Sequence, residues 1–302
     1  MAHPRCHFNP LVHYGRHLGR TVHALCNVQA LITNGILRLG ELADELEESF
    51  TVDLLQMVPG LKEHLMTGNA EGTVAIAELV QKGAASARSD DTKSLKSAVI
   101  DWITPRGQSL QPPLACNVKI NRGFHHKHTG ALLCPAGLDW ANNKIRAKLC
   151  SGKMTVSGDQ WPIFLYLGYN YDPEDPWNGL LSVDKEPKAT RSGNARIHRM
   201  TCVTTASITY VCFALSSLPV FSRTDTVTDS ERFYNTLQDL LEDPEEKEEV
   251  DQLLVWWNRQ VFPSYLSSQC APVKDSALAR IKERRVALRN TTPGSSNHST
   301  AA

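Results

Sequence analysis

The stretch Asp243–Tyr265, DPEEKEEVDQLLVWWNRQVFPSY, decides the fold class because it combines the main signals of a helix. Asp243 can accept hydrogen bonds from the free N–H groups of a first turn, and Pro244 suits a first helical position, where no N–H is needed. Four glutamates follow at the positive end of the helix dipole. Apolar side chains then recur at helical spacing and predict one buried stripe, made of Val250, Leu253, Leu254, Trp257 and Val261 and widened by Trp256. Pro263 ends the predicted helix.

Other segments outward from this stretch share its helical period. Thr21–Glu48 predicts one long helix. Thr73–Gln81 predicts a shorter helix that ends at Gly83, and a separate helix follows it, capped at Asp91 or Thr92. Thr228–Glu231 predicts a capping box that launches a further helix. Because no segment of useful length has the period-two alternation of a strand, we expect a mainly α fold.

Composition divides the chain into three regions. Residues 1–19 hold four histidines among Pro, Asn, Gly and Arg, and we predict a poorly ordered leader there. Residues 20–290 are expected to form a single irregular helical domain with a long loop-rich insertion over about residues 105–140, where Pro and Gly are frequent and no period is sustained. A long irregular segment inside a compact domain is often functional. Residues 291–302 predict a disordered tail.

Charge and cysteine content indicate the compartment. The 32 lysines and arginines balance the 32 aspartates and glutamates, so no global field favours nucleic acid or membrane. The amino terminus lacks the apolar core of a signal peptide, and the eight scattered cysteines include no CxxC pair. We therefore expect reduced thiols in an intracellular protein of the cytoplasm or nucleus that is not secreted. The most apolar run, Ile208–Phe221, is too short for a membrane span, so no membrane partner is expected.

The insertion holds the sharpest chemical candidate, which consists of His125, His126, His128 and Cys134 with Cys116 and Cys150 on either side. Neutral imidazoles and thiolates suit Zn²⁺, and two of each make a tetrahedral site. The alternative is a set of loop histidines beside a buried Cys134. Because the spacing matches no zinc finger and has no CxxC anchor, we expect no metal, no cofactor and no catalytic residue in this segment.

Two basic stretches are candidate nucleic-acid contacts: Lys188, Arg191 and Arg196 in an exposed loop, and Arg284, Arg285 and Arg289 on a last predicted helix. Clustered lysines and arginines contact phosphates without reading sequence, and their binding is sensitive to salt. The alternative is that the loop arginines pair internally with the acidic residues that follow Asp243.

A further signal comes from long phrases spread through the chain. They are SARSDDTKSLK (86–96), LLCPAGLDW (132–140), SGDQWPIFLY (157–166), YDPEDPW (171–177), EPKATRSGNARIH (186–198), VFSRTDTVTDSERFY (220–234) and LLVWWNRQVFPSY (253–265). Together they resemble a domain of unknown function that is multi-copy in mushroom-forming fungi, with similarity over roughly Arg20–Leu288. The resemblance implies no activity, ligand or catalytic residue. Against the family's pattern this copy looks internally shortened, most of all between Leu181 and Val183.

These observations favour a non-enzymatic intracellular interaction module with a protein partner that the sequence does not identify. The first alternative is a nucleic-acid-binding accessory protein linked to a mobile element. The second alternative is a metal-dependent enzyme that uses the His125–Cys134 cluster.

Overall fold

The computed structural model describes residues 9–33, 50–67, 69–105, 107–182, 205–223 and 229–261, and also residues 277, 280, 281 and 284. This part of the chain is mainly helical, which confirms the fold class expected from the sequence. Its only β-structure is two isolated bridges, Pro135 with Pro162 and Tyr166 with Leu180. Among the described helices, none has the length and apolar character needed to cross a membrane. The chain divides into two compact units, residues 1–250 and 251–302, and the described helices that end before residue 247 all belong to the first.

The described helices fall into two stretches separated by the loop-rich insertion. Those before the insertion are α1 (Pro10–Thr21), a helix over residues 28–33, α3 (Phe50–Met57), α4 (Leu61–Thr67) and α5 (Ala70–Ile103). Those within and after it are η1 (Gly123–His125), α6 (Lys127–Leu133), α7 (Asn143–Cys150), η2 (Ile163–Leu165), η3 (Leu167–Tyr169), α9 (Thr205–Leu215), α10 (Ser230–Glu242), η4 (Pro244–Glu246) and α11 (Lys247–Val261). The expected insertion is thus mostly irregular but contains one short 3-10 turn and one short α-helix.

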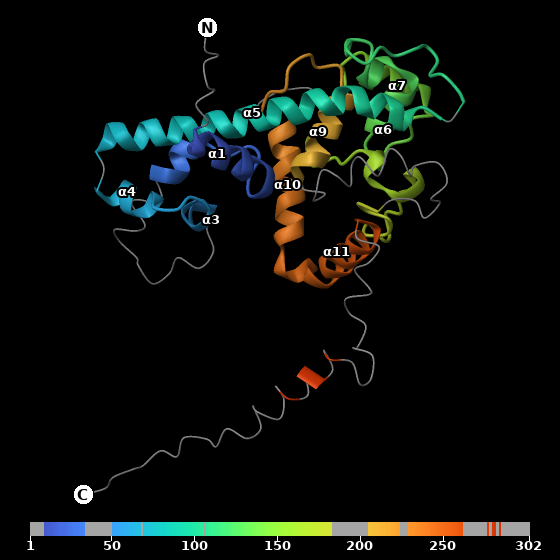
Figure 1. Cartoon of the computed structure of the whole chain (residues 1–302). Helices are drawn as coiled ribbons and strands as arrows, with labels where there is room; N and C mark the ends of the chain where they lie inside the picture. The colour runs from blue at the N-terminus through green and yellow to red at the C-terminus, as the bar shows by residue number, and fades with distance from the viewer. Residues whose placement is uncertain are drawn as a thin grey trace, which may run out of the picture. The chain divides into compact units, whose positions relative to one another are not determined.

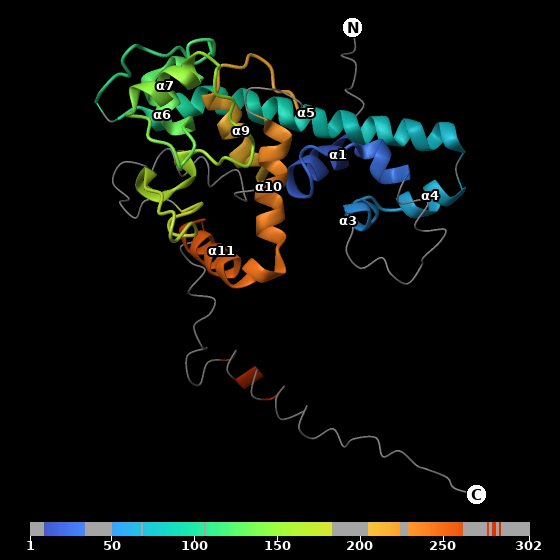
Figure 2. The same cartoon turned by 180° about the vertical axis from the view of Figure 1, so that it is seen from behind.

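Helix α5 is the axis on which the first unit is built. Figures 1 and 2 show it as one long helix, with α1 beside one half and α9 beside the other. Its 34 residues correspond to a length of roughly 50 Å. The predicted break at Gly83 is wrong, because the helix continues through it. The predicted second cap is also wrong, since the Thr92 hydroxyl donates back to the carbonyl of Arg88 at 2.8 Å within the same helix.

Gly83 faces α1 and lets the two backbones meet. A Cβ atom on Gly83 would lie 2.2 Å from the carbonyl oxygen of Val12, and one on Gly15 would lie 2.1 Å from that of Val80. These distances are far shorter than any van der Waals contact, so only glycine fits at either position. Gly83, which suggested the end of a helix, therefore serves the packing of α5 against α1.

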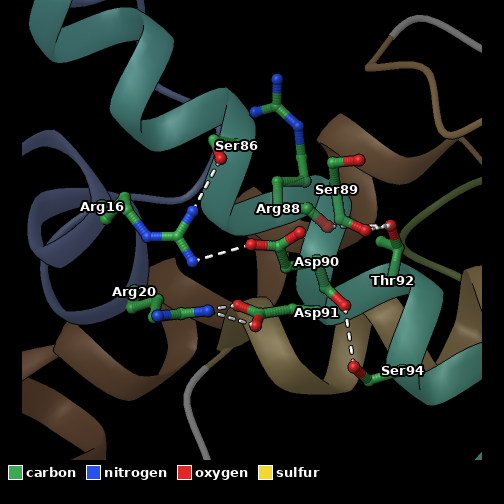
Figure 3. A network of polar contacts seen from close by, with 9 residues as sticks. All are labelled: Arg16, Arg20, Ser86, Arg88, Ser89, Asp90, Asp91, Thr92 and Ser94. Carbon is green, nitrogen blue, oxygen red and sulfur yellow. Dashed lines mark hydrogen bonds and ion pairs between the residues drawn. The ribbon is translucent and has the colours of Figure 1, made fainter. Parts of the chain in front are cut away.

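Two ion pairs fix the register of α1 on α5 (Figure 3). Arg16 donates to Asp90 at 2.8 Å and to the Ser86 hydroxyl at 2.6 Å. Arg20 holds both carboxylate oxygens of Asp91, at 2.9 and 2.6 Å. The hydrogen bond from Arg16 lowers the pKa of Asp90. Because the Arg16 pair is largely exposed, it contributes alignment more than stability.

Helix α1 corrects the predicted leader from residue 10 onward. Asn9 caps the helix by accepting from the backbone N–H of Leu11 at 3.0 Å, and Pro10 occupies the first helical position. Leu18 is fully buried in a core that also receives Leu54 of α3 and Val80 of α5. Histidines and glycines gave this segment the composition of a loop, but the glycines are what allow it to dock. Residues 1–8 lie outside the described part of the chain.

The long helix predicted over Thr21–Glu48 is also corrected. Helix α1 ends at Thr21, turns follow, and a separate helix begins at residue 28 and covers the described residues 28–33. Residues 34–49 lie outside the described part of the chain.

The stretch that indicated the fold class forms η4 and α11. Asp243 caps it as predicted, since its carboxylate accepts from the N–H of Glu245 at 2.9 Å. Val250 is buried, but Leu254 is 53% exposed, so the predicted buried stripe is wrong at that position. Helical spacing identifies a helix without specifying what covers its apolar side. Pro263 and the predicted tail, residues 291–302, lie outside the described residues.

The contact between α1 and α5 predicts an unusual response to a substitution that normally favours helices. Gly83→Ala should lower the free energy of unfolding by about 2 kcal/mol or more, because the added methyl group forces the two backbones apart. This loss outweighs the gain of about 1 kcal/mol that alanine brings to an ordinary helix interior. Urea unfolding measures the difference, with Gly137→Ala as control, since a Cβ at Gly137 meets nothing within 4 Å. A Gly83→Ala variant as stable as the natural protein would contradict this packing.

Candidate functional site

The insertion is organised by one buried arginine. The Arg122 side chain is fully buried, and its guanidinium donates to four backbone carbonyls. Two of them, Ala115 at 3.1 Å and Cys116 at 2.9 Å, belong to the insertion itself. The others belong to Lys96 on α5, at 2.9 Å, and Ala214 on α9, at 2.8 Å. Arg122 therefore ties an irregular loop to two helices far away in the sequence.

A second buried cation lies beside it. The Lys119 ammonium donates to the carbonyl of Phe213 at 2.6 Å and lies 3.2 Å from the centroid of the Phe213 ring. Both cations thus reach the last turn of α9, where carbonyl groups have no helical partner and the helix dipole is negative. Burial lowers the pKa of Arg122, but an arginine stays charged in proteins. The carboxyl end of α9 is accordingly held by two positive charges.

The residues after Arg122 form one wall of a cavity of about 340 Å³. The other walls come from α6, α7, the loop over residues 151–162, the end of α9 and the side chain of Phe233 on α10. The residues that line the cavity are Gly123, Phe124, His125, Leu133, Leu149, Cys150, Ser151, Gly152, Val156, Ser157, Gly158, Gln160, Pro162, Cys212, Ser216, Ser217 and Phe233. Its volume lies at the lower end of the range of small-molecule pockets.

The loop over residues 151–162 is held against α10 by close contacts. The backbone N–H of Gly158 donates to the Asp229 carboxylate at 3.0 Å, and a Cβ on Gly158 would lie only 2.3 Å from the backbone nitrogen of Phe233. The Trp161 indole N–H donates to the Thr236 hydroxyl at 3.1 Å. These contacts give the cavity a defined wall although the wall is a loop.

The start of α10 differs from the predicted capping box because its polar groups serve these tertiary contacts. Asp229 is the cap residue, and its side chain bonds Gly158 instead of the first turn of its own helix. The Glu231 carboxylate pairs with Arg223 instead of reaching back to a cap. Thr228, the predicted cap, lies outside the described residues.

Two polar side chains of the cavity are held in structural hydrogen bonds. The Cys150 thiol donates to the carbonyl of Phe124 at 2.9 Å, and the Ser216 hydroxyl donates to that of Phe213 at 2.8 Å. His125 lies at the exposed edge. A nucleophile needs a base within hydrogen-bond reach, and neither Cys150 nor Ser216 is bonded to one in the described structure. The arrangement is therefore suited to enclosing an apolar group.

The four candidate metal ligands do not converge. His126 is buried, its Nε2 lies 2.8 Å from the carbonyl oxygen of Pro112, and its Nδ1 accepts from the N–H of His128 at 3.2 Å to cap α6. Both ring nitrogens are thus engaged with the backbone, and His126 serves the structure of the loop. His125 and His128 are exposed. Within the described ranges, no group of three or more His, Cys, Asp or Glu residues is placed to hold a metal ion.

Cys134, the fourth candidate ligand, is bonded within its own loop. Its side chain is buried and its thiol donates to the carbonyl of Leu138 at 3.6 Å. Burial, with a smaller effect of Asp139, raises the pKa of Cys134 to about 11. The thiol therefore stays protonated at neutral pH, which does not suit nucleophilic attack, because the attacking species is the thiolate.

The candidate nucleic-acid contacts fall almost entirely outside the described residues. Arg284 is described and exposed, in the second unit. Lys188, Arg191, Arg196, Arg285 and Arg289 are outside the described part of the chain, and their role stays a prediction.

Sequence reasoning missed the residues that build the site. Lys119 and Arg122 appeared as ordinary polar residues of a loop, and no local pattern marks a basic side chain that will be buried. Their only sequence signal is position, since they lie in a long irregular insertion, the kind of segment that is often functional.

Comparison with known proteins gives one match. The model of a family described as "Family of unknown function (DUF6698)" matches residues 82–262, from within α5 to the end of α11. This match confirms the resemblance to a domain of unknown function over the larger part of the chain. Neither a curated protein nor a solved structure matches.

The bonding of Arg122 predicts a large loss of stability on its removal. Arg122→Leu should lower the free energy of unfolding by about 3 kcal/mol or more, because four carbonyls lose their donor and each unsatisfied group costs about 1 kcal/mol or more. Chemical denaturation measures the loss. The control is Arg232→Leu, which breaks an exposed ion pair with Asp159 and should cost under about 1 kcal/mol. Equal losses of unfolding free energy in the two variants would show that the bonds of Arg122 stabilise the fold no more than an exposed ion pair does.

The buried thiol predicts a fall of stability in alkali. The pKa of Cys134 is about 11 in the folded chain against an ordinary value of 9.0, so its contribution is complete below pH 9 and is lost as pH rises toward 11. Urea unfolding between pH 8 and pH 10 should show this fall, and Cys134→Ala should flatten it. Exposed Cys116 provides the control, since Cys116→Ala should leave the slope unchanged. Identical slopes for the natural protein and Cys134→Ala would refute the assignment.

Proposed function

We propose a binding role for this chain, which belongs to the DUF6698 family of unknown function and inherits no activity from that membership. In this role it is a non-enzymatic interaction module. The cavity that η1 lines, called here the cavity behind η1, receives an apolar side chain of a protein partner. The proposal rests on one observation: a cavity of about 340 Å³, walled largely by apolar groups, opens beside the exposed His125 and Cys150.

The chemistry of the lining supports binding over catalysis. The thiol of Cys150 and the hydroxyl of Ser216 both donate to backbone carbonyls and serve the structure. Leu133, Leu149 and Phe233 supply apolar surface from three different helices. Burying one large apolar side chain there is worth about 1.5–3 kcal/mol, enough for an anchor residue but not for a complete interface. A partner would therefore add contacts around the cavity mouth.

The setting of this module is part of the proposal. We place it inside the cell, in the cytoplasm or nucleus, and not among secreted proteins. The five described cysteines are free thiols, which supports a reducing compartment. We also propose that it is a fungal copy, shortened relative to longer members of a multi-copy family. The phrases that carry the resemblance support this origin.

The alternative function is a nucleic-acid-binding accessory protein linked to a mobile element. Its support is the exposed Arg284, together with the sequence clustering of Arg285, Arg289 and the loop residues Lys188, Arg191 and Arg196. These basic residues would contact phosphates without reading bases.

Filling the cavity tests the binding role. Peptides selected from a random display library on the natural protein should carry a large aromatic or aliphatic anchor. Cys150→Trp should weaken their binding by roughly 10–100-fold, because the indole occupies the space of that anchor. Fluorescence anisotropy with a labelled peptide gives the dissociation constants.

The control variant is Cys116→Trp, which adds the same indole at an exposed cysteine outside the cavity and should leave binding intact. Urea unfolding of both variants establishes that they fold. Peptides that bind the two variants equally well, or selected peptides without an apolar anchor, would refute the proposed role of the cavity.

A further inference from the structure

A second concavity lies on α5, away from the cavity behind η1. This cleft has a volume of about 470 Å³ and is defined by Ala85, Arg88, Ser89, Thr92, Lys93 and Lys96 of α5 together with Phe213, Pro219, Val220 and Phe221. One wall thus carries three basic side chains, the other is apolar, and no carboxylate lines either. All of these residues belong to the first compact unit.

The basic side chains belong to one broad stripe of α5, because Arg88, Thr92 and Lys96 follow one another at steps of four residues and Lys93 lies three residues before Lys96. Lys93 is exposed and Lys96 is half-buried, and neither ammonium has a hydrogen bond or ion pair within the described ranges. Arg88 uses Nη1 to donate to the carbonyl of Ala24 at 3.0 Å, and Nη2 has no such bond in the described structure. The Arg88 guanidinium lies 5.9 Å from the centroid of the Phe221 ring, which orients it at the cleft.

The neighbouring acids are paired with arginines of α1. Asp90 is held by Arg16 and Asp91 by Arg20, both from α1. Figure 3 shows these carboxylates turned toward α1, with Arg88 pointing away from them. Lys93 is close enough to Asp90 to help lower the pKa of that carboxyl, but no carboxylate lines the cleft itself.

The opposite wall supplies flat apolar surface. Phe221 packs edge-on against Phe213, with ring centroids 5.3 Å apart, so its orientation is fixed. Val220 is 72% exposed although it is a large aliphatic side chain, and Pro219 beside it is also exposed. A simple anion would bind the basic wall and leave this apolar surface exposed to water, so the cleft suits an anion that also carries an apolar group.

We infer that the cleft binds a nucleotide unit. Its phosphate lies among Arg88, Lys93 and Lys96, and its base lies against Phe221 and Val220. Phosphate attracts clustered Lys and Arg side chains, and a base is the flat apolar group that stacks on aromatic or aliphatic side chains. An acidic peptide would satisfy the cations but not the apolar wall. This site does not depend on the proposed role of the cavity behind η1, and it uses none of the basic residues predicted from sequence.

The nucleotide can come from two sources, a free nucleoside phosphate or a single-stranded nucleic acid, and calorimetric titration at low salt distinguishes them. One arm uses ATP and the other an oligothymidylate of about ten nucleotides. We expect saturable binding in at least one arm. Tighter binding of the strand, with a slope of log K against log salt near −2, identifies nucleic acid, because about three phosphate contacts contribute ~0.7 each.

Two sets of variants, each with its own control, test the location. Lys93→Ala and Lys96→Ala should each weaken binding roughly tenfold, because each removes a charge-assisted hydrogen bond. Lys82→Ala, on the same helix outside the cleft, should change nothing. Val220→Asp places a negative charge at the apolar wall and should abolish binding. Its control is Ile120→Asp, which alters a side chain that is also 72% exposed but outside the cleft.

Several results would overturn the inference. The first is no binding of ATP or oligothymidylate by a protein that folds normally in urea titrations. The second is binding that Lys93→Ala, Lys96→Ala and Val220→Asp leave unchanged. The third is inorganic phosphate or a polyglutamate peptide binding as tightly as the nucleotide, since the apolar wall would then contribute nothing.

Discussion

The buried guanidinium of Arg122 is the interaction on which both concavities depend. Its donors connect the carbonyl of Lys96, within the basic stripe of α5, to the carbonyl of Ala214 at the end of α9. The same side chain holds the carbonyls of residues 115 and 116 and so positions the turn that begins at Gly123. An arginine suits this task because its planar group carries five donors in a fixed geometry, whereas a lysine has three around one atom.

A buried charge bonded only to carbonyls is costly to form and costly to lose. Its desolvation is offset by charge-assisted hydrogen bonds and by the negative end of the α9 dipole, not by a carboxylate. Removing the side chain would leave carbonyls buried without donors, so the loop has few alternative arrangements of similar energy. This explains how a segment rich in proline and glycine, with few regular hydrogen bonds, can form part of a cavity with a defined shape.

Local signals in the sequence predicted what is local in the structure. The mainly helical class, the cap at Asp243 and the irregular insertion follow from periodicity and residue type, and all are present. Features that depend on a distant partner were missed. Gly83 resembles a helix stop unless Val12 is known to lie against it, and histidines of the insertion resemble zinc ligands unless His126 is seen bonded to Pro112. Likewise, the residues next to Arg122 in sequence do not predict that it is buried, and those next to Leu254 do not predict that it is exposed.

Helix α9 shows why the two concavities coexist in one small unit. It is buried along nearly its whole length, so it has no solvent-facing side of its own. Cys212 and Ser216, which are four residues apart and share one side, line the cavity behind η1, while Phe213 between them in sequence lines the cleft on α5. The helix therefore separates the two concavities, with Cys212 facing one and the aromatic ring of Phe213 facing the other. Because its last carbonyls are fixed by Lys119 and Arg122, neither wall can shift without breaking buried charge-assisted bonds. Two chemically different surfaces thus derive their rigidity from the same two cations.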